Sequence, residues 1–479
     1  MSGRKATTDI RPGYIILSVG MPSISLPKKW RWTPLLNVAE LATGHTPSRK
    51  IKDYWGGEIP WMAVGDARKF SGRKILKTKE YTNLKGIENS AAVILPINTV
   101  CLSRTASIGY SVILGKEMAT SQGFVNWICS EHLNPRFLQL LFIAEKRFLF
   151  EISEGTAHTT IYFPEVKAFH IGLPPRAEQD RIVAKLDSLF GQLESINNSL
   201  EHIPTLLKNF RKQVLTQAVT GKLTEEWRVG KELEEWVPDK NDQDYRPWKI
   251  TLPNDWKVHS FKKTAEIQAN LQNPDEYPDH ILVAPNHIEK YTGRLIQTQL
   301  TKEIAPKSDK HYFEKGSIIY SKIRPYLSKL IIAEFDGLCS ADMYPIKANV
   351  EQKYLFYYML SQIFLQYVTT AGERSVLPKV NQKGLNNIPV PVPPIKEQLE
   401  IVKRIENLFA KANAIEKHYK ALKTKIEHLP QTILLKAFKG ELVQQLESDG
   451  DARELLKEIG ELKKRGSGIK MAKKTVKNK

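Results

Sequence analysis

The stretch PPRAEQDRIVAKLDSLF occupies residues 174–190, and a similar stretch, PPIKEQLEIVKRIENLF, occupies residues 393–409. Residues 173–223 align with residues 392–442 without a gap, and 14 of the 51 positions are identical. Proline is tolerated at the start of a helix but not inside it, and an acidic residue in the first turn complements the helix dipole. The two stretches therefore predict the beginnings of two long helices, with Glu178 and Glu397 in their first turns. Gly221 and Gly440 are the expected stop signals.

Apolar residues follow each predicted helix start at steps of four and three. In the first copy they fall at 182, 186, 189, 193, 196, 200 and 203, and the second copy continues the same alternation from 401 to 429. This heptad spacing is typical of a coiled coil. We expect the two helices to pack on each other rather than to bind separate partners. The expected seam residues are Ile182, Leu186, Leu189, Leu193, Ile401, Ile405, Leu408 and Ile415.

The repetition extends upstream of the helices, at nearly the same offset. LPKKW at 26–30 corresponds to LPNDW at 252–256, RKFSGR at 68–73 to EKYTGR at 289–294, and LSRTASIG at 102–109 to YSKIRPYL at 320–327. The chain therefore consists of one sequence unit of about 220 residues, present twice, with a divergent front half and a more similar back half.

The front halves predict mixed α/β domains. Residues 93–103, 110–114 and 124–130 in the first copy, and 316–321 and 329–335 in the second, are rich in β-branched and apolar residues and predict strands. Residues 135–150 and 351–364 predict helices, the first with Asn134 as its cap and Pro135 at its first position. Residues 224–250 are charged, contain prolines and show no steady periodicity, so we expect a linker there.

Composition points to a polyanionic partner. The 479 residues carry a formal net charge of +19, and nucleic acid is the first candidate for such a basic chain. No apolar run approaches the roughly 18 residues of a membrane-spanning helix, and the N-terminal segment lacks a secretion-signal pattern. Cys101, Cys129 and Cys339 form no metal-binding or CxxC spacing, so we expect buried thiols in a reducing cytoplasm.

No catalytic motif is present in the sequence. The segment GYSVILGKE at 109–117 departs from the phosphate-loop pattern in spacing and in having Glu117 after the lysine. Neither Pro-Pro pair follows the Asn or Asp that amino-methyltransferase motifs require, and no zinc-enzyme pattern occurs. We therefore expect a binding protein with no catalytic residue and no metal site.

The candidate DNA contacts are basic and polar residues at corresponding turns of the two copies. Lysine and arginine neutralise phosphates, and arginine can also read base edges. These candidates are Arg68, Lys69, Arg73, Ser103 and Arg104 in the first copy and Lys290, Arg294, Ser321, Lys322 and Arg324 in the second. Trp55, Trp61 and Tyr326 are candidates for stacking on sugars or bases.

The chain resembles the specificity subunit of type I restriction-modification systems. The resemblance rests on the repeated PPxxEQ opening, the helix ends AVTGKL and AFKGEL, the LPxxW starts, and DYWGGEIPWMAVGD at 53–66. It covers roughly residues 20–450. It implies an α/β fold in which two target recognition domains are each followed by a long helix, with the helices paired as an antiparallel coiled coil. The expected division is an N-terminal extension at 1–25, recognition domains at 26–172 and 251–391, spacer helices at 173–223 and 392–445, the linker at 224–250, and a basic tail at 446–479.

The resemblance also implies function and partners. It implies a non-catalytic subunit that recognises a bipartite, asymmetric target on double-stranded DNA. It implies two methylation subunits, which carry S-adenosylmethionine and dock on the spacer helices, and two restriction subunits, which use ATP and Mg²⁺. This chain would hold no cofactor and would act in the cytoplasm of a bacterium or archaeon, associated with the nucleoid.

Two alternatives remain open at this point. A coiled-coil scaffold could bind acidic proteins or bind nucleic acid without specificity, and a nucleic-acid enzyme could have an unrecognised site. DNA binding in the presence of competing random DNA separates the scaffold from a specific reader, and a methylation assay of the chain alone tests the enzyme.

Overall fold

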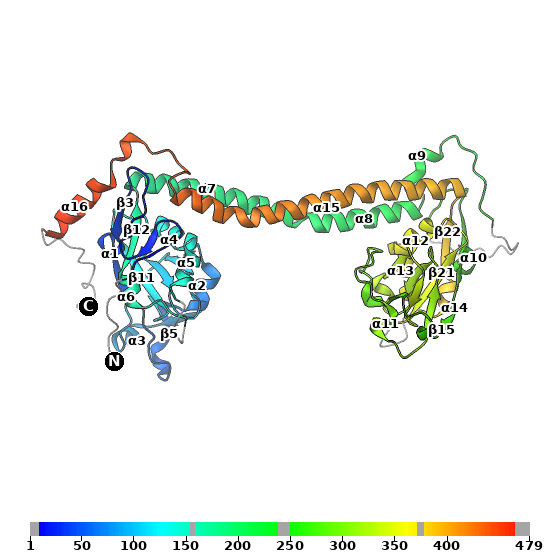
Figure 1. Cartoon of the computed structure of the whole chain (residues 1–479), viewed down its shortest axis with the longest axis horizontal. Helices are drawn as coiled ribbons and strands as arrows, with labels where there is room; N and C mark the ends of the chain where they lie inside the picture. Colours follow the sequence, from blue (N-terminus) through cyan, green and yellow to red (C-terminus); the bar gives the residue numbers. More distant parts are fainter. Residues whose placement is uncertain (1–8, 154–158, 238–249, 371–377, 465–479) are drawn as a thin grey trace. The chain divides into compact units, whose positions relative to one another are not determined.

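The chain divides into two compact units (Figure 1). The computed structural model describes residues 9–153, 159–237, 250–370 and 378–464. Unit 1 comprises Met1–Asn198 with Lys423–Lys479, and unit 2 comprises Ser199–Leu422. The units therefore differ from the contiguous sequence repeats, because each contains one α/β domain and segments of both long helices. Buried residues near the start of one long helix share a hydrophobic core with residues near the end of the other.

The α/β domain of unit 1 contains three sheets, with strand orders β1-β2-β12-β3, β10-β5-β7 and β4-β11-β8-β9-β6. The strands expected at 93–103, 110–114 and 124–130 are confirmed as β8, β9 and β11. The strands are β1 (Arg11–Pro12), β2 (Leu17–Val19), β3 (Arg31–Pro34), β4 (Ala39–Thr43), β5 (Trp55–Met62), β6 (Lys74–Ile75), β7 (Glu80–Thr82), β8 (Val100–Ser103), β9 (Ser111–Leu114), β10 (Ala119–Thr120), β11 (Phe124–Cys129) and β12 (Phe169–Leu173). The helices are α1 (Leu35–Val38), η1 (Lys52–Tyr54), α2 (Val64–Phe70), α3 (Leu84–Glu88), α4 (Pro135–Ala144), α5 (Lys146–Glu151) and α6 (Phe163–Lys167).

The domain of unit 2 repeats part of this arrangement, since its sheet β14-β21-β18-β19 has the same order as β4-β11-β8-β9 in unit 1. Unit 2 also contains one parallel strand pair, β16 with β20, as unit 1 contains the parallel pair β5 with β10. The strands are β13 (Lys257–Ser260), β14 (Ala265–Ile267), β15 (Leu271–Gln272), β16 (Ile281–Val283), β17 (Lys310–Phe313), β18 (Ile318–Ser321), β19 (Leu330–Ile332), β20 (Gly337–Cys339), β21 (Met343–Ala348) and β22 (Pro389–Val392). The helices are α10 (Phe261–Thr264), η3 (Pro274–Glu276), η4 (Pro285–His287), α11 (Thr301–Ile304), η5 (Pro325–Leu327), α12 (Gln352–Leu360), α13 (Gln362–Thr370) and α14 (Gln382–Asn386).

The helices expected at 135–150 and 351–364 are each divided in two. Asn134 caps α4 as predicted, because its side chain accepts hydrogen bonds from the N–H groups of Arg136 and Phe137. The first division falls at Glu145, whose buried carboxylate accepts hydrogen bonds from other parts of the chain. The second falls at Ser361, whose hydroxyl accepts a hydrogen bond from the N–H of Phe364.

The N-terminal residues form part of the core of unit 1. Strand β2 pairs with the edge of β12, and Ile15, Ile16, Leu17 and Val19 are buried. The Glu145 carboxylate accepts the backbone N–H of Tyr14 at 2.9 Å and that of Ile15 at 2.6 Å. The extension predicted at 1–25 thus contains, within its described part, an integral edge of a sheet.

In unit 2 the strand that corresponds to β12 is β22, and its edge away from β13 is satisfied by side chains. Strand β22 has the sequence PVPV, so Pro389 and Pro391 present no N–H groups. The hydroxyl of Tyr354 donates to the carbonyl of Pro391 at 2.6 Å, and the hydroxyl of Tyr358 donates to that of Pro389. Buried tyrosines thus satisfy the carbonyl groups that, in unit 1, face a neighbouring strand.

The long helices are α7 (Arg176–Glu201), α8 (Ile203–Val219) and α15 (Ile395–Phe438). The single helix expected at 173–223 is interrupted at His202 because Pro204, in the first turn of α8, lacks an N–H group. Gly221 and Gly440 follow the helix ends in the left-handed conformation, with φ of 76° and 74°, so the predicted stop signals are confirmed. Within unit 2, α8 and the first part of α15 run in opposite directions. Arg211, in the middle of α8, donates to Glu416 of α15, whereas Val219, at the end of α8, shares a core with Ile401, near the start of α15.

The predicted seam is buried mainly near the α/β domains. Ile182, Leu186, Ile401 and Ile405 are fully buried, whereas Leu189, Leu193 and Leu408 are half-buried. Ile415 departs from the prediction, since its side chain is 51% exposed and the neighbouring seam position Ala412 is buried instead. A coiled coil along the whole length of the helices stays a prediction.

The segment expected as a basic tail begins with an ordered part. The 3-10 turn η6 (Glu447–Asp449) and helix α16 (Ala452–Lys464) belong to unit 1. Arg181 donates to Asp449 at 2.7 Å and Arg31 donates to Asp451 at 2.8 Å, and Ile459 is buried in the core. Residues 465–479, with most of the predicted basic stretch, lie outside the described residues. The predicted linker contains α9 (Glu225–Arg228), and its residues 238–249 lie outside them as well.

Candidate nucleic-acid interface

The turns after β8 and β18 have the same hydrogen-bond pattern in both units. In unit 1, the N–H of Arg104 donates to the carbonyl of Gly123, and the carbonyl of Arg104 accepts the N–H of Ile161. In unit 2, the N–H of Lys322 donates to the carbonyl of Asp342, and the carbonyl of Lys322 accepts the N–H of Val380. Ala106 and Arg324 then both adopt positive φ, at 58° and 48°. The structural counterpart of Arg104 is therefore Lys322, and that of Ala106 is Arg324, in agreement with the alignment of residues 102–109 with residues 320–327.

The predicted contacts Ser103 and Ser321 are buried inside these turns. Ser103 Oγ donates to the carbonyl of Ser107 at 2.5 Å and accepts the N–H of Tyr110 at 2.9 Å. Ser321 Oγ donates to the carbonyl of Ile323 at 3.0 Å. Both hydroxyls hold the turn together and are not presented to a ligand.

Arg104 and Lys322 are half-buried and pack on aromatic rings of their own units. The Arg104 guanidinium lies 4.5 Å from the ring centre of Phe163 and donates to the carbonyl of Ile161 at 3.3 Å. The Lys322 ammonium lies 4.7 Å from the ring of Tyr344. Burial lowers the pKa of both groups. In contrast, Arg324 is exposed, as is the ring of Tyr326, which is 43% accessible.

Helix α2 carries two of the other candidates. Arg68 and Lys69 are exposed in its last turn. Arg68 donates to Ser107 Oγ at 3.1 Å, which links α2 to the turn after β8. This places Arg68 beside the turn that carries Arg104, so two of the predicted DNA contacts of unit 1 lie close together.

Arg73 and Arg294 point toward the long helices. Each follows a glycine with positive φ, Gly72 or Gly293. Arg73 Nη2 lies 3.8 Å from Glu194 Oε1 on α7, and Arg294 Nη2 donates to Asn413 Oδ1 on α15 at 2.9 Å. These two predicted DNA contacts therefore connect the α/β domains to the helices.

Lys290 belongs to a groove of about 860 Å³ in unit 2, between the 289–294 loop, α8 and α15. Lys208 and Lys212 line the same groove, and Lys208 lies 5.8 Å from the ring of Tyr291. None of the three lysines makes an ion pair with a residue that the structure describes. Five basic residues line the groove against three acidic ones, Glu289, Glu406 and Glu416, and the last two already pair with Lys353 and Arg211. The groove therefore has surplus positive charge. The two α8 lysines could have been suspected from their spacing on one helix face.

An arginine that sequence reasoning missed lies between the two candidate tryptophans of unit 1. The Arg49 guanidinium is 4.0 Å from the ring of Trp55 and 4.8 Å from that of Trp61, and Arg49 Nη2 donates to Glu80 Oε2 at 2.8 Å. Hydrogen bonding to Arg49 lowers the pKa of Glu80. Trp61 is buried, but Trp55 is half-buried, so only Trp55 presents part of its ring to a ligand.

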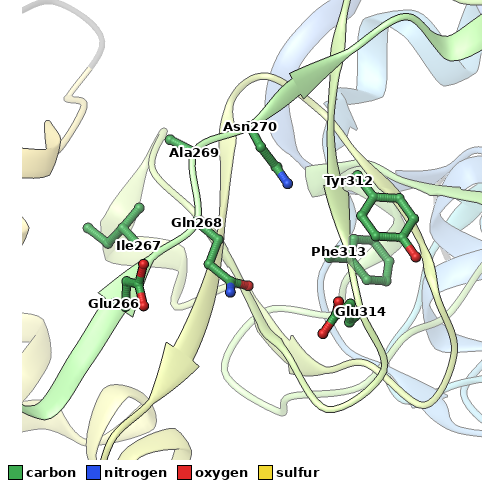
Figure 2. Close-up of a pocket in the computed structure, with 8 residues that line it drawn as sticks. All are labelled: Glu266, Ile267, Gln268, Ala269, Asn270, Tyr312, Phe313 and Glu314. Carbon is green, nitrogen blue, oxygen red and sulfur yellow. The ribbon is translucent and has the colours of Figure 1, made fainter.

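A second hollow of about 380 Å³ in unit 2 was also missed. Figure 2 shows Gln268 and Asn270, on the connection between β14 and β15, extending toward the segment that carries Tyr312 and Glu314. Amides, a phenol and a carboxylate can donate to or accept from base edges, but nothing in the spacing of these residues indicated a common site.

Within the described ranges, no group of three histidine, cysteine or acidic residues could hold a metal ion. Burial raises the pKa of Cys129 to about 12 and raises the pKa values of Cys101 and Cys339 as well, which disfavours their reactive thiolate forms. No described helix is long and apolar enough to cross a membrane.

Comparison with known proteins identifies relatives of the whole arrangement. The family described as the type I restriction modification DNA specificity domain matches residues 27–205 and 253–427. The chain is 37% identical over 428 residues to the specificity subunit of type I restriction enzyme EcoDI from Escherichia coli. The alignment covers 89% of this chain and 91% of that protein. It is 30% identical over 322 residues to the EcoBI specificity subunit of Escherichia coli, and this alignment covers 62% of this chain and 64% of that protein.

Solved structures agree on the fold. A crystal structure of the HsdS subunit from Thermoanaerobacter tengcongensis matches with a TM-score of 0.59 at 18% identity, over 88% of this chain and 99% of that one. A chain from a structural study of assembly and conformational transition in a type I R-M system matches with a TM-score of 0.60, also at 18% identity, over 87% and 100%.

Proposed function

Since the chain belongs to the family of type I restriction enzyme specificity subunits, we propose that it recognises a bipartite, asymmetric DNA target, with one half-site read by each unit. The observation that carries this proposal is the pair of family domains, at 27–205 and 253–427. They share the order of a four-stranded sheet but differ in the surfaces around it. Different surfaces on a common scaffold are suited to two different half-sites.

The exposed candidates define where base reading is expected. Arg68 and Lys69 in unit 1 and Arg324 in unit 2 are exposed on or beside the equivalent turns. Lys290 lies in the basic groove and suits a phosphate contact. The positive charge of the chain favours this polyanionic ligand, with a formal net value of +19.

The proposed role includes partners that supply the chemistry. The chain would direct two methylation subunits, which carry S-adenosylmethionine, and two restriction subunits, which use ATP and Mg²⁺, and it would act in the cytoplasm on nucleoid DNA. The long helices are the proposed docking surface for the methylation subunits. The chain itself would hold no cofactor and perform no catalysis.

A domain exchange tests the proposal. Methylated positions in the DNA of the source cell first define the target. Replacing residues 9–165 by the corresponding segment of a relative, so that the N-terminal sheet edge moves with its domain, should change one half-site and leave the other intact. A change in both half-sites contradicts the one-unit, one-half-site assignment. Methylation or cleavage of DNA by the purified chain alone contradicts the non-catalytic role.

A further inference from the structure

Among the contacts that attach each α/β domain to the long helix that follows it, three use helix positions that are equivalent in the two repeats. They are residues 179, 187 and 194 in unit 1 and residues 398, 406 and 413 in unit 2, and each pair is 219 residues apart (398 − 179, 406 − 187 and 413 − 194). We call these three contacts the clamp of each unit.

The first clamp contact is made by the glutamine of the PPxxEQ opening. Gln179 Oε1 accepts the backbone N–H of Asn134 at 2.9 Å, and Gln398 Oε1 accepts that of Glu351 at 2.8 Å. Both glutamines are fully buried. Each also donates from Nε2 to the carbonyl of the first proline of its own opening. The start of α4 or α12 is thus fixed to the start of the long helix.

The second contact is an ion pair about two helical turns further along. Arg136 Nη2 lies 2.7 Å from Asp187 Oδ1, and Lys353 Nζ lies 2.6 Å from Glu406 Oε1. The residue types differ between the units while the pairing of charges is retained. A contact that persists through substitution of both partners indicates a geometric requirement shared by the two units.

The third contact comes from the loop arginines Arg73 and Arg294, which reach Glu194 and Asn413. The pair in unit 1 is longer, at 3.8 Å, and both of its side chains are more than two-thirds exposed. The bond in unit 2 is shorter, at 2.9 Å. The third contact is therefore tested best in unit 2.

Together the three contacts define both the axial position and the rotation of a domain on its helix. Fifteen residues separate the first and third positions (194 − 179), which corresponds to about 22 Å at roughly 1.5 Å per residue. Steps of eight and seven residues keep the three positions within about 100° of one another around the helix. A rigid body held at three separated points on one face has no remaining freedom to slide or roll.

We infer that Arg294 and Lys353, with Arg73 and Arg136, are positioning residues that fix the gap between the half-sites, and not base readers. This inference rests on the proposed function. A domain that rolls on its helix would keep its base contacts but would accept DNA with a different gap, since one base pair changes both distance and rotation.

The test compares gap selectivity with base selectivity. The full chain, assembled with its methylation subunits, is measured with DNA duplexes whose half-sites are constant and whose gap varies by one or two base pairs. In the variant Arg294→Ala/Lys353→Ala, the preference for the native gap should fall about tenfold, a size typical of one lost specific contact, while the preferred bases stay unchanged. Lys302→Ala is the matched control, because it removes an exposed ion pair, with Asp279, inside the same domain.

Two further measurements keep the inference falsifiable. The exchange Lys353→Glu/Glu406→Lys should restore gap selectivity relative to Lys353→Glu alone. Spin labels at the exposed positions Lys315 and Lys417 should show a broader distance distribution in the double alanine variant, with or without DNA. An unchanged distribution, or unchanged gap selectivity, overturns the clamp. Failure of the wild-type complex to recognise any bipartite target overturns the proposed function instead, and the label distances still test the clamp.

Discussion

Trp256 Nε1 donates a hydrogen bond to Glu397 Oε2 at 2.9 Å in the interior of unit 2. This bond joins two motifs that lie 141 residues apart, the tryptophan of LPNDW and the glutamate of PPIKEQ. Glu397 is fully buried and also accepts from Thr224 Oγ1 at 2.6 Å and from Arg228. The helix-dipole argument for an acidic residue in the first turn is therefore incomplete, because this carboxylate is the acceptor at the junction of three segments.

The variant Trp256→Phe removes one of these donors and leaves a buried carboxylate oxygen without it. We expect the free energy of unfolding to fall by about 1–3 kcal/mol, measured by urea denaturation. The control Trp227→Phe, at a half-buried ring of the linker, should change it by less than about 0.5 kcal/mol. Equal effects of the two substitutions would show that ring volume, and not the hydrogen bond, matters at position 256.

Local features of the fold and the buried start of each helix seam were predictable from the sequence, whereas individual side-chain partners were not. The proline openings, the Asn134 cap and the strands around Ser103 follow from short-range rules of helix entry, capping and β-propensity. These rules do not predict the partner of Arg294, because Asn413 is 119 residues away. In the sequence, a basic residue that faces a helix cannot be distinguished from one that faces DNA. The different surroundings of Arg104 and Arg324 were not predictable either, since the sequence does not show that Arg104 packs on Phe163 while Arg324 is exposed.

Glu145 provides a prediction for pH dependence. Burial raises the pKa of its carboxyl group, despite four hydrogen bonds from backbone N–H groups of residues 14–17. Between about pH 4.3, the ordinary glutamate pKa, and the raised pKa of the folded state, the folded protein holds a proton that the unfolded protein releases. Stability contributed by this group is therefore present at low pH and is lost as the pH rises through the folded pKa.

The variant Glu145→Gln cannot titrate at this position. The stability of the wild type relative to the variant should decline as the pH rises through that interval and should then become constant. Urea denaturation of both proteins across the acidic range measures this difference. Parallel stability curves would contradict a raised pKa at Glu145.

Arg324 and Arg104 should have different roles, although both were predicted to read bases. Arg324→Ala removes an exposed side chain beside Tyr326 and should weaken specific binding by about 1–3 kcal/mol if it contacts a guanine. Arg104→Ala removes the group stacked on Phe163 and should lower the unfolding free energy by about 1 kcal/mol. Binding to target and random DNA, together with thermal unfolding, separates the two effects. If the variant Arg104→Ala lost base selectivity while its stability stayed unchanged, Arg104 would again be assigned a role in base reading.

The groove lysines should contribute affinity without selectivity. Replacing Lys208, Lys212 and Lys290 by alanine removes three cations, and each lost phosphate contact should reduce the slope of log affinity against log salt by about 0.9. Target and random DNA should be affected alike. Lys302, whose charge is paired with Asp279, is the control. An unchanged salt dependence would show that DNA does not enter the groove, and a loss of methylation-subunit binding would identify an acidic protein segment as its occupant.

The length of the helices should set the gap between the half-sites. Removing seven residues from each helix between the clamps, 197–203 and 422–428, keeps the heptad phase and spares Glu194, Arg211 and Asn413. The helices should shorten by about 10 Å at roughly 1.5 Å per residue, which corresponds to about three base pairs and about a third of a turn of DNA. The variant should therefore prefer a shorter gap or fail to bind both half-sites at once. Removing four residues from each helix shifts the apolar seam and should instead reduce stability. A folded heptad-deletion variant that binds the original gap with unchanged affinity would show that helix length does not determine the spacing.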